Sequence, residues 1–207
     1  MKGKQIVTSL DLILQWIMRL AFVNVLWILF SLMGFVIGGV FPATVAALGV
    51  SRKWIMGQHD IKIWRTFKQI YRQEFIGANK LGWLLSVIGG LLYLNYRVII
   101  NSAEDIFFII PFAFYLLLFF YIIVVIWSFP LLTHYQASIV QHIKNAIIIG
   151  LTKIHYTIVS GFVIVLTMYL SLSYPGIIPF FSFSIVSLLC MWFSMQIFSK
   201  VDNTSAG

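Results

Sequence analysis

Long uninterrupted runs of apolar residues alternate with short polar stretches along this chain of 207 residues. The four clearest runs carry almost no charged side chain and lie at 81–100, 107–132, about 154–172 and 177–198. A helix needs about 20 predominantly apolar residues to cross the roughly 30 Å hydrocarbon core of a bilayer. The pattern therefore predicts a membrane-spanning helix in each of these runs.

A further apolar region, residues 20–51, contains no charged residue and is too long for one span but short for two. Three glycines and a proline interrupt its middle, at Gly34, Gly38, Gly39 and Pro42. Proline is tolerated in the first turn of a helix, so Pro42 favours the start of a second helix. The region predicts a hairpin: a helix at about 12–33, a helix break and packing site at the glycines, and a shorter helix at 42–54. A single long span remains the alternative.

Charged residues gather in one connection, about 52–80, which carries seven Lys and Arg residues against two acidic ones. Because Lys and Arg accumulate in short cytoplasmic loops, we expect this connection inside the cell and the cation-free loop at 101–105 outside. The N-terminal hairpin then leaves both termini in the cytoplasm. The predicted fold class is all-α: a polytopic integral membrane protein with five to six transmembrane helices, six favoured, forming a single transmembrane domain over residues 1–207.

The connection contains an amphipathic helical pattern at 61–75. Apolar positions at spacings of three or four share one face: Ile61, Trp64, Phe67, Tyr71 and Phe75. Cations follow a neighbouring face: Lys62, Arg65, Lys68 and Arg72. Asp60 stands where an N-cap is expected. Such a cytoplasmic basic helix can lie among anionic lipid headgroups or dock onto a partner protein with its aromatic side chains as anchors, and the pattern leaves both open.

Composition narrows the function classes. With 61% hydrophobic residues and a mean hydropathy of +0.98, the chain has more apolar surface than a soluble protein of this length can bury. The net charge of +8 fits membrane topology better than nucleic-acid binding, because no polar domain is present to carry a basic patch. A glycine-rich phosphate-binding loop and a His-Glu-x-x-His motif are both absent, so we expect neither an enzyme nor a cofactor or metal site.

Two asparagines, Asn24 and Asn95, lie within predicted spans. An amide inside a bilayer needs hydrogen-bond partners, because no water is present to supply them. We therefore expect both side chains to hydrogen-bond between helices.

Two stretches resemble the YesL-like family, small polytopic membrane proteins of unknown function. In "NVLWILFSLMGFVIGGVFPATVAALGVSRKWIMG" an Asn-x-x-Trp opening, a glycine-containing break and a Pro-Ala pair carry the likeness, through Asn24, Trp27, Pro42, Ala43, Ala46, Ala47, Lys53 and Trp54. In "FKQIYRQEFIGANKLG" spaced aromatic residues run into Asn-x-x-Gly, through Phe67, Tyr71, Phe75, Asn79 and Gly82. The likeness covers roughly residues 20–85. Many relatives carry Thr-x-Gly before the proline, which this sequence lacks.

The resemblance implies a multi-pass protein of the bacterial cytoplasmic membrane, often associated with carbohydrate uptake systems of the ATP-binding-cassette (ABC) type. Together with the basic helix, it favours a non-enzymatic accessory or assembly component whose partners are the lipid bilayer and ABC transporter permease subunits. The alternative is a stand-alone permease or exporter of small solutes, because the glycine-rich break resembles the interrupted helices around some transport sites. Self-association is left open.

Overall fold

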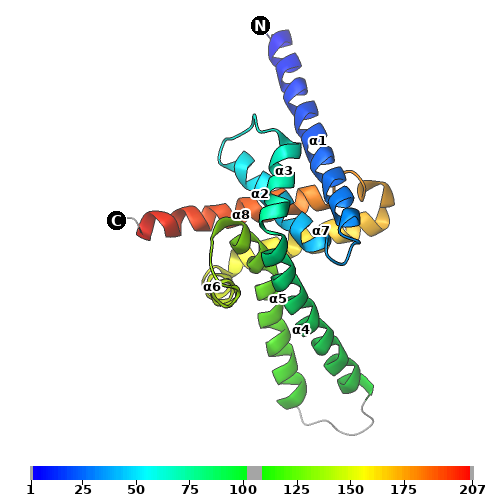
Figure 1. Ribbon diagram of the computed structural model, residues 1–207, viewed down its shortest axis with the longest axis vertical. Helices are drawn as coiled ribbons and strands as arrows, with labels where there is room; N and C mark the ends of the chain where they lie inside the picture. Colours follow the sequence, from blue (N-terminus) through cyan, green and yellow to red (C-terminus); the bar gives the residue numbers. More distant parts are fainter. Residues whose placement is uncertain (1, 102–108, 206–207) are drawn as a thin grey trace.

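The computed structural model describes residues 2–101 and 109–205, and every regular element in those ranges is helical (Figure 1). In chain order the elements are α1 (Lys2–Met33), α2 (Val40–Ile55), α3 (Ile63–Gln73), α4 (Phe75–Asn101), α5 (Ile109–His134), α6 (Ile139–Thr152), α7 (Ile154–Ser173), the 3-10 turn η1 (Pro175–Ile177) and α8 (Ser182–Ser205). The predicted all-α class is confirmed. Residues 102–105 of the predicted outer loop, and the predicted start of a span at 107, lie outside the described residues.

Five of the described helices are long and apolar enough to cross a membrane: Asp11–Met33, Phe75–Asn101, Ile109–His134, Ile154–Ser173 and Ser182–Asp202. The chain is therefore a polytopic helical membrane protein. The predicted hairpin is present, since α1 ends at Met33 and α2 begins at Val40. At 16 residues α2 is about 24 Å long, so the segment predicted as a sixth span is a helix too short to cross the hydrocarbon core by itself.

The helix α6 was not predicted, because its residues lie between two runs predicted to span the membrane. It has 14 residues, and the Ser138 side chain caps its start by accepting a hydrogen bond of 3.3 Å from the Gln141 backbone N–H. Its longest line of contact is with α5. The Ser138 cap and the isoleucine-rich run after it were the available signals for this helix.

The helix α2 is the axis around which α1, α3, α5 and α8 pack. Ten of its 16 residues are buried, so protein rather than lipid surrounds most of it. Its small side chains, among them Ala43, Ala46 and Ala47 with no exposed surface, let the neighbouring backbones approach closely. This burial explains why so short a helix is stable here, because packing against the neighbouring helices stabilises it.

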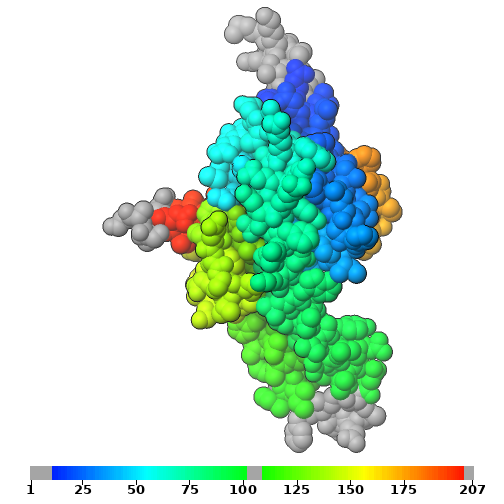
Figure 2. Space-filling model, in the orientation of Figure 1, coloured from blue at the N-terminus to red at the C-terminus, as the bar shows by residue number. Residues whose placement is uncertain are grey.

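The outer helices extend away from this centre. In Figure 1, α1 and the α4–α5 hairpin point in opposite directions, and α7 and α8 lie across them. The far half of the α4–α5 hairpin projects from the body (Figure 2) and exposes large apolar side chains, such as Leu94, Val98 and Phe112. Exposed apolar surface of this extent requires lipid or another apolar partner.

Candidate functional site

The helix α3 packs its aromatic side chains inward. Phe67 has no exposed surface and Tyr71 is 9% exposed, and their rings lie 5.2 and 4.9 Å from the ring of Phe30 on α1. These two side chains, proposed above as contacts for lipid or a partner, are part of the protein core instead. Trp64 is 46% exposed and Phe75 is 37% exposed, so they are the members of the aromatic set that can contact other molecules.

The start of α3 also differs from the expected one. The N-cap position is Lys62, which makes no side-chain cap hydrogen bond, and Asp60 lies before the helix in a turn. The predicted Asp60 cap was therefore wrong. The preceding Gly57 adopts a φ of +83° in the turn, and α3 begins only at Ile63, three residues after Asp60.

The cations of α3 point outward. Lys62, Arg65 and Arg72 are exposed and Lys68 is partly buried. Trp64 and three of the cations line a shallow groove of about 480 Å³ along the helix. Among the described residues no carboxylate lies within ion-pair distance of these four side chains. We call Trp64 with Lys62, Arg65, Lys68 and Arg72 the α3 face, and Figure 2 shows α3 at the surface of the molecule.

A polar pocket of about 360 Å³ lies between α3 and the ends of α2 and α5. Arg52 and Lys53 supply cations from α2, and Glu74 follows α3. Arg52 donates a hydrogen bond of 3.0 Å from Nη1 to the backbone oxygen of Thr133, while its buried Nε has no protein partner. Burial raises the pKa of Glu74, because the pocket solvates the carboxylate less well than water does. The pocket therefore offers cationic hydrogen-bond donors and a carboxyl group to a small polar ligand.

The rim of this pocket is tied to the end of α8. Asp202 accepts a hydrogen bond of 2.8 Å from the Tyr135 hydroxyl and lies 3.2 Å from Nε2 of His134. Burial and the hydrogen bond to Asp202 raise the pKa of Tyr135 well above its ordinary value, so the phenol stays protonated and remains a donor. Elements distant in sequence therefore meet at one end of the molecule.

Side chains from α3 and α4 hold the break between α1 and α2. The Tyr71 hydroxyl donates to the backbone oxygen of Phe30 at 3.2 Å, and Asn79 Nδ2 donates to the backbone oxygen of Gly38 at 3.0 Å. Phe35 and Val36 adopt φ values of 54° and 63°, which are unfavourable for bulky and β-branched residues. The surrounding hydrogen bonds therefore hold a strained turn.

Glycine is required at two positions of this break. A Cβ on Gly34 would meet the backbone of Gly39, and a Cβ on Gly39 would meet the backbone oxygen of Ser31. Pro42 lies in the first turn of α2, as predicted, and is buried. The break is a tight packing site in which backbone touches backbone.

The residues that carry the family resemblance are mostly buried and join helices to one another. Asn24 donates to the backbone oxygen of Ile178 at 2.8 Å and accepts from the N–H groups of Phe183 and Ser184 at 2.9 and 3.2 Å. The predicted interhelical role of Asn24 is confirmed. Within the described residues Asn95 donates only to Leu91 of its own helix, so the same prediction for Asn95 was wrong.

Trp27 and Gly82, which also carry the family resemblance, likewise join helices to one another. The Trp27 indole donates to Thr44 Oγ1 at 3.1 Å and stacks on the ring of Phe183. At Gly82 a Cβ would enter the ring of Phe41, so glycine is needed for the approach of α4 to α2. The residues that carry the resemblance are therefore related to helix packing more directly than to a reactive centre.

Sequence reasoning missed the polar pocket. Its cations were recognised only as topology signals, and the polar run that follows Leu132 was treated as part of a loop. The run Thr133, His134, Tyr135 and Gln136 directly after a long apolar segment was the available signal.

The described residues define a polytopic membrane protein with a short central helix and a cationic helix packed on it. The chain belongs to the YesL-like family: the family described as "Protein of unknown function, DUF624" matches residues 20–96.

Three proteins of Bacillus subtilis (strain 168) are similar to this chain over most of its length. "Uncharacterized protein YteU" is 34% identical, over 91% of this chain and 84% of its own. "Uncharacterized protein YesV" is 34% identical, over 90% and 89%, and "Uncharacterized protein YesL" is 29% identical, over 90% and 88%. No solved structure matches the chain.

Proposed function

We propose that this chain is a non-enzymatic accessory or assembly component of a membrane complex, namely a carbohydrate uptake system of the ABC type. In this proposal the α3 face binds the permease subunits at the cytoplasmic surface of a bacterial membrane. The observation that carries the proposal is the fixed presentation of the α3 face.

The anchoring of α3 supports a docking role. Phe67 and Tyr71 fix the helix to α1 and α2, so Trp64 and the outward cations are presented from a rigid support. Binding then costs little backbone conformational entropy, because the helix is already ordered. Trp and Arg are also the residue types that contribute most at the centres of protein interfaces. Cations without nearby carboxylates also favour an acidic partner surface and steer its approach.

Cross-linking in the native membrane, followed by a mild-detergent pull-down of the tagged full chain, tests the proposal. We expect ABC permease subunits in near-stoichiometric amount. The variant Arg65→Gln with Arg72→Gln should lower their recovery about three- to tenfold, because each exposed ion pair contributes up to about 1 kcal/mol. Trp64→Ala should lower it further, since aromatic anchors contribute more than rim charges.

The matched control is Lys80→Gln with Lys144→Gln, which removes the same charge from exposed positions on α4 and α6. It should recover the permease subunits as the unaltered chain does. The docking role would be contradicted if the α3 variants recovered as much permease as the unaltered chain does.

A stand-alone permease or exporter is the second candidate, and the strained turn at Phe35 and Val36 is the observation that favours it. Strained, interrupted backbone is common where transporters bind solutes. Recovery of the protein without permease subunits, together with uptake of a small solute into liposomes that contain this protein alone, would favour this candidate over the first.

A further inference from the structure

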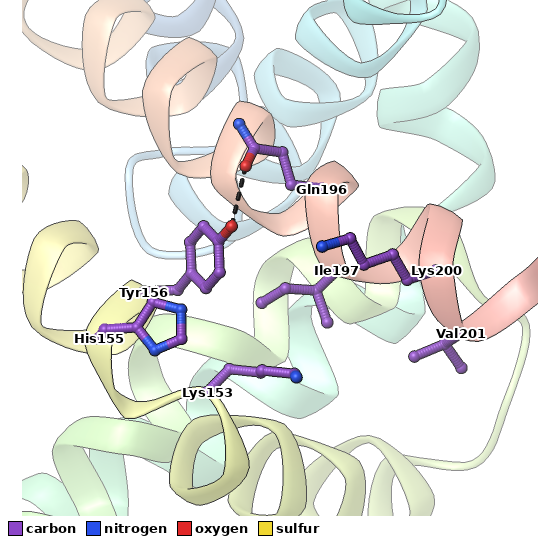
Figure 3. Close-up of a pocket in the computed structure, with 7 residues that line it drawn as sticks. All are labelled: Lys153, His155, Tyr156, Gln196, Ile197, Lys200 and Val201. Atoms are coloured by element: carbon purple, nitrogen blue, oxygen red, sulfur yellow. Dashed lines mark hydrogen bonds between the residues drawn. The ribbon is translucent and has the colours of Figure 1, made fainter.

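A second cleft, separate from the α3 face, lies between α7 and α8 (Figure 3). It has a volume of about 610 Å³. Lys153, His155 and Tyr156 line it from the start of α7, and Gln196 and Lys200 line it from the last turns of α8. Because α7 and α8 are both long enough to span a membrane, the cleft opens at one end of a pair of membrane helices.

The polar side chains of this cleft come from both walls. The Lys200 side chain extends from α8 toward Tyr156, and the Lys153 side chain extends from the opposite wall toward α8 (Figure 3). The Tyr156 hydroxyl donates a hydrogen bond of 3.0 Å to Gln196 Oε1, which fixes the two helices to each other. Among the described residues that line the cleft, none is acidic. The cleft therefore suits a negatively charged group.

Apolar surface adjoins these cations. Ile197 and Val201 line the α8 wall of the cleft, and α7 exposes apolar side chains along its length, such as Ile158 and Phe162. A molecule with a charged head and an apolar tail would place its head among the lysines and its tail along α7.

We propose that this cleft binds the headgroup of an anionic phospholipid. The phosphate lies between the Lys153 and Lys200 ammonium groups, and the acyl chains follow the apolar surface of α7. A soluble anion would use the cations but leave the adjoining apolar surface without a partner. A zwitterionic phospholipid would bring a cationic group close to the two lysines.

Native mass spectrometry of the full-length chain, released from detergent and titrated with dioleoyl phosphatidylglycerol, tests this site. We expect one phosphatidylglycerol to bind more tightly than phosphatidylcholine of the same acyl chains. Lys153→Gln with Lys200→Gln should weaken that binding about thirty-fold, because each cation near an anionic membrane surface contributes about fivefold. Lys153→Arg with Lys200→Arg should retain it, since the charge is kept.

Two charge-matched variants locate the effect. Lys80→Gln with Lys144→Gln, and Arg65→Gln with Arg72→Gln on the α3 face, should each change this binding event less than twofold. A thermal scan of each variant checks that it remains folded.

Three outcomes would overturn the proposal. The first is unchanged phosphatidylglycerol binding by the Lys153→Gln, Lys200→Gln chain. The second is equal binding of phosphatidylcholine. The third is displacement of phosphatidylglycerol by inorganic phosphate at equal concentration, which would define a site for small soluble anions.

Discussion

The region around α2 and the far half of the α4–α5 hairpin are both rich in apolar residues, but they use them differently. Around α2, apolar side chains are buried against other helices, and polar groups such as Asn24 and Tyr71 form hydrogen bonds between elements. In the hairpin, side chains such as Leu117 and Ile110 are about half exposed. A lipid-facing surface needs only apolar character, whereas a helix packed on other helices needs particular shapes and hydrogen bonds.

The comparison explains where the family resemblance lies. It covers roughly residues 20–85, and the family match covers 20–96, that is, the second part of α1, all of α2 and α3, and most of α4. Substitutions in the packed surroundings of α2 should therefore destabilise the protein far more than equivalent substitutions in the lipid-facing half of the α4–α5 hairpin.

The largest effect is expected at Gly39. In Gly39→Ala the new methyl group would meet the backbone oxygen of Ser31, and neither backbone segment can move without opening the α1–α2 break. We expect a loss of about 3 kcal/mol in the free energy of unfolding, at the upper end for overpacking. Unfolding in mixed detergent–SDS micelles, followed by tryptophan fluorescence, measures it.

Gly90→Ala is the matched control for this change, because nothing lies within 4 Å of a Cβ placed on Gly90 in α4. It should leave the unfolding midpoint unchanged or raise it slightly, since alanine favours a helix over glycine by roughly 0.5–1 kcal/mol. Equal losses in the free energy of unfolding for Gly39→Ala and Gly90→Ala would show that the two regions do not differ in packing.

The next effect is expected at Asn24. Asn24→Leu removes three hydrogen bonds that join α1 to the segment around the start of α8, at about 0.6 kcal/mol each. We expect a loss of about 2 kcal/mol in the same unfolding measurement. Asn95→Leu is its counterpart in the exposed part of α4, where the amide donates to Leu91 of its own helix, and it should change stability by about 0.5 kcal/mol at most. A larger loss at Asn95 than at Asn24 would refute the comparison.

The helical class and the long spans could be predicted from sequence, because the hydropathy of a 20-residue run reflects directly what a bilayer requires. The hairpin break could be predicted as well, since glycine and proline act locally on the backbone. The helix α6 was missed because its 14 residues are apolar but too few for a span.

The site was less predictable for a different reason. Periodicity identifies which residues share a helix face, and it placed Phe67 and Tyr71 on one side of α3 correctly. Periodicity does not show whether that face contacts lipid or protein, because both environments are apolar. Contacts such as that of Arg52 with Thr133, which are 81 residues apart, depend on how α2 and α5 meet and leave no local signal.

A smaller effect is expected at Tyr71. Tyr71→Phe keeps the ring against Phe30 but removes the hydrogen bond to the Phe30 backbone oxygen, leaving that buried acceptor with one partner fewer. We expect a loss of about 1 kcal/mol in the free energy of unfolding. Tyr115→Phe, at a side chain that is 59% exposed on α5, is the control and should have no measurable effect. A stabilising Tyr71→Phe would show that the hydroxyl does not support the α1–α2 break.

The smallest effect is expected at Glu74, at the border between the α2 region and the polar pocket. Burial raises the pKa of this carboxyl above its ordinary value of 4.5, so ionisation is easier in the unfolded chain than in the folded one. As the pH rises above that value, the unfolded state loses its proton first, and the folded state is destabilised relative to it. Glu74→Gln should therefore raise the melting temperature slightly at pH 7, and the gain should disappear near pH 4, where the carboxyl is protonated in both states. Thermal scans of both chains in nanodiscs across this pH range measure the difference. A gain that is equal at both pH values would mean that packing of the amide, rather than removal of a poorly solvated charge, causes it.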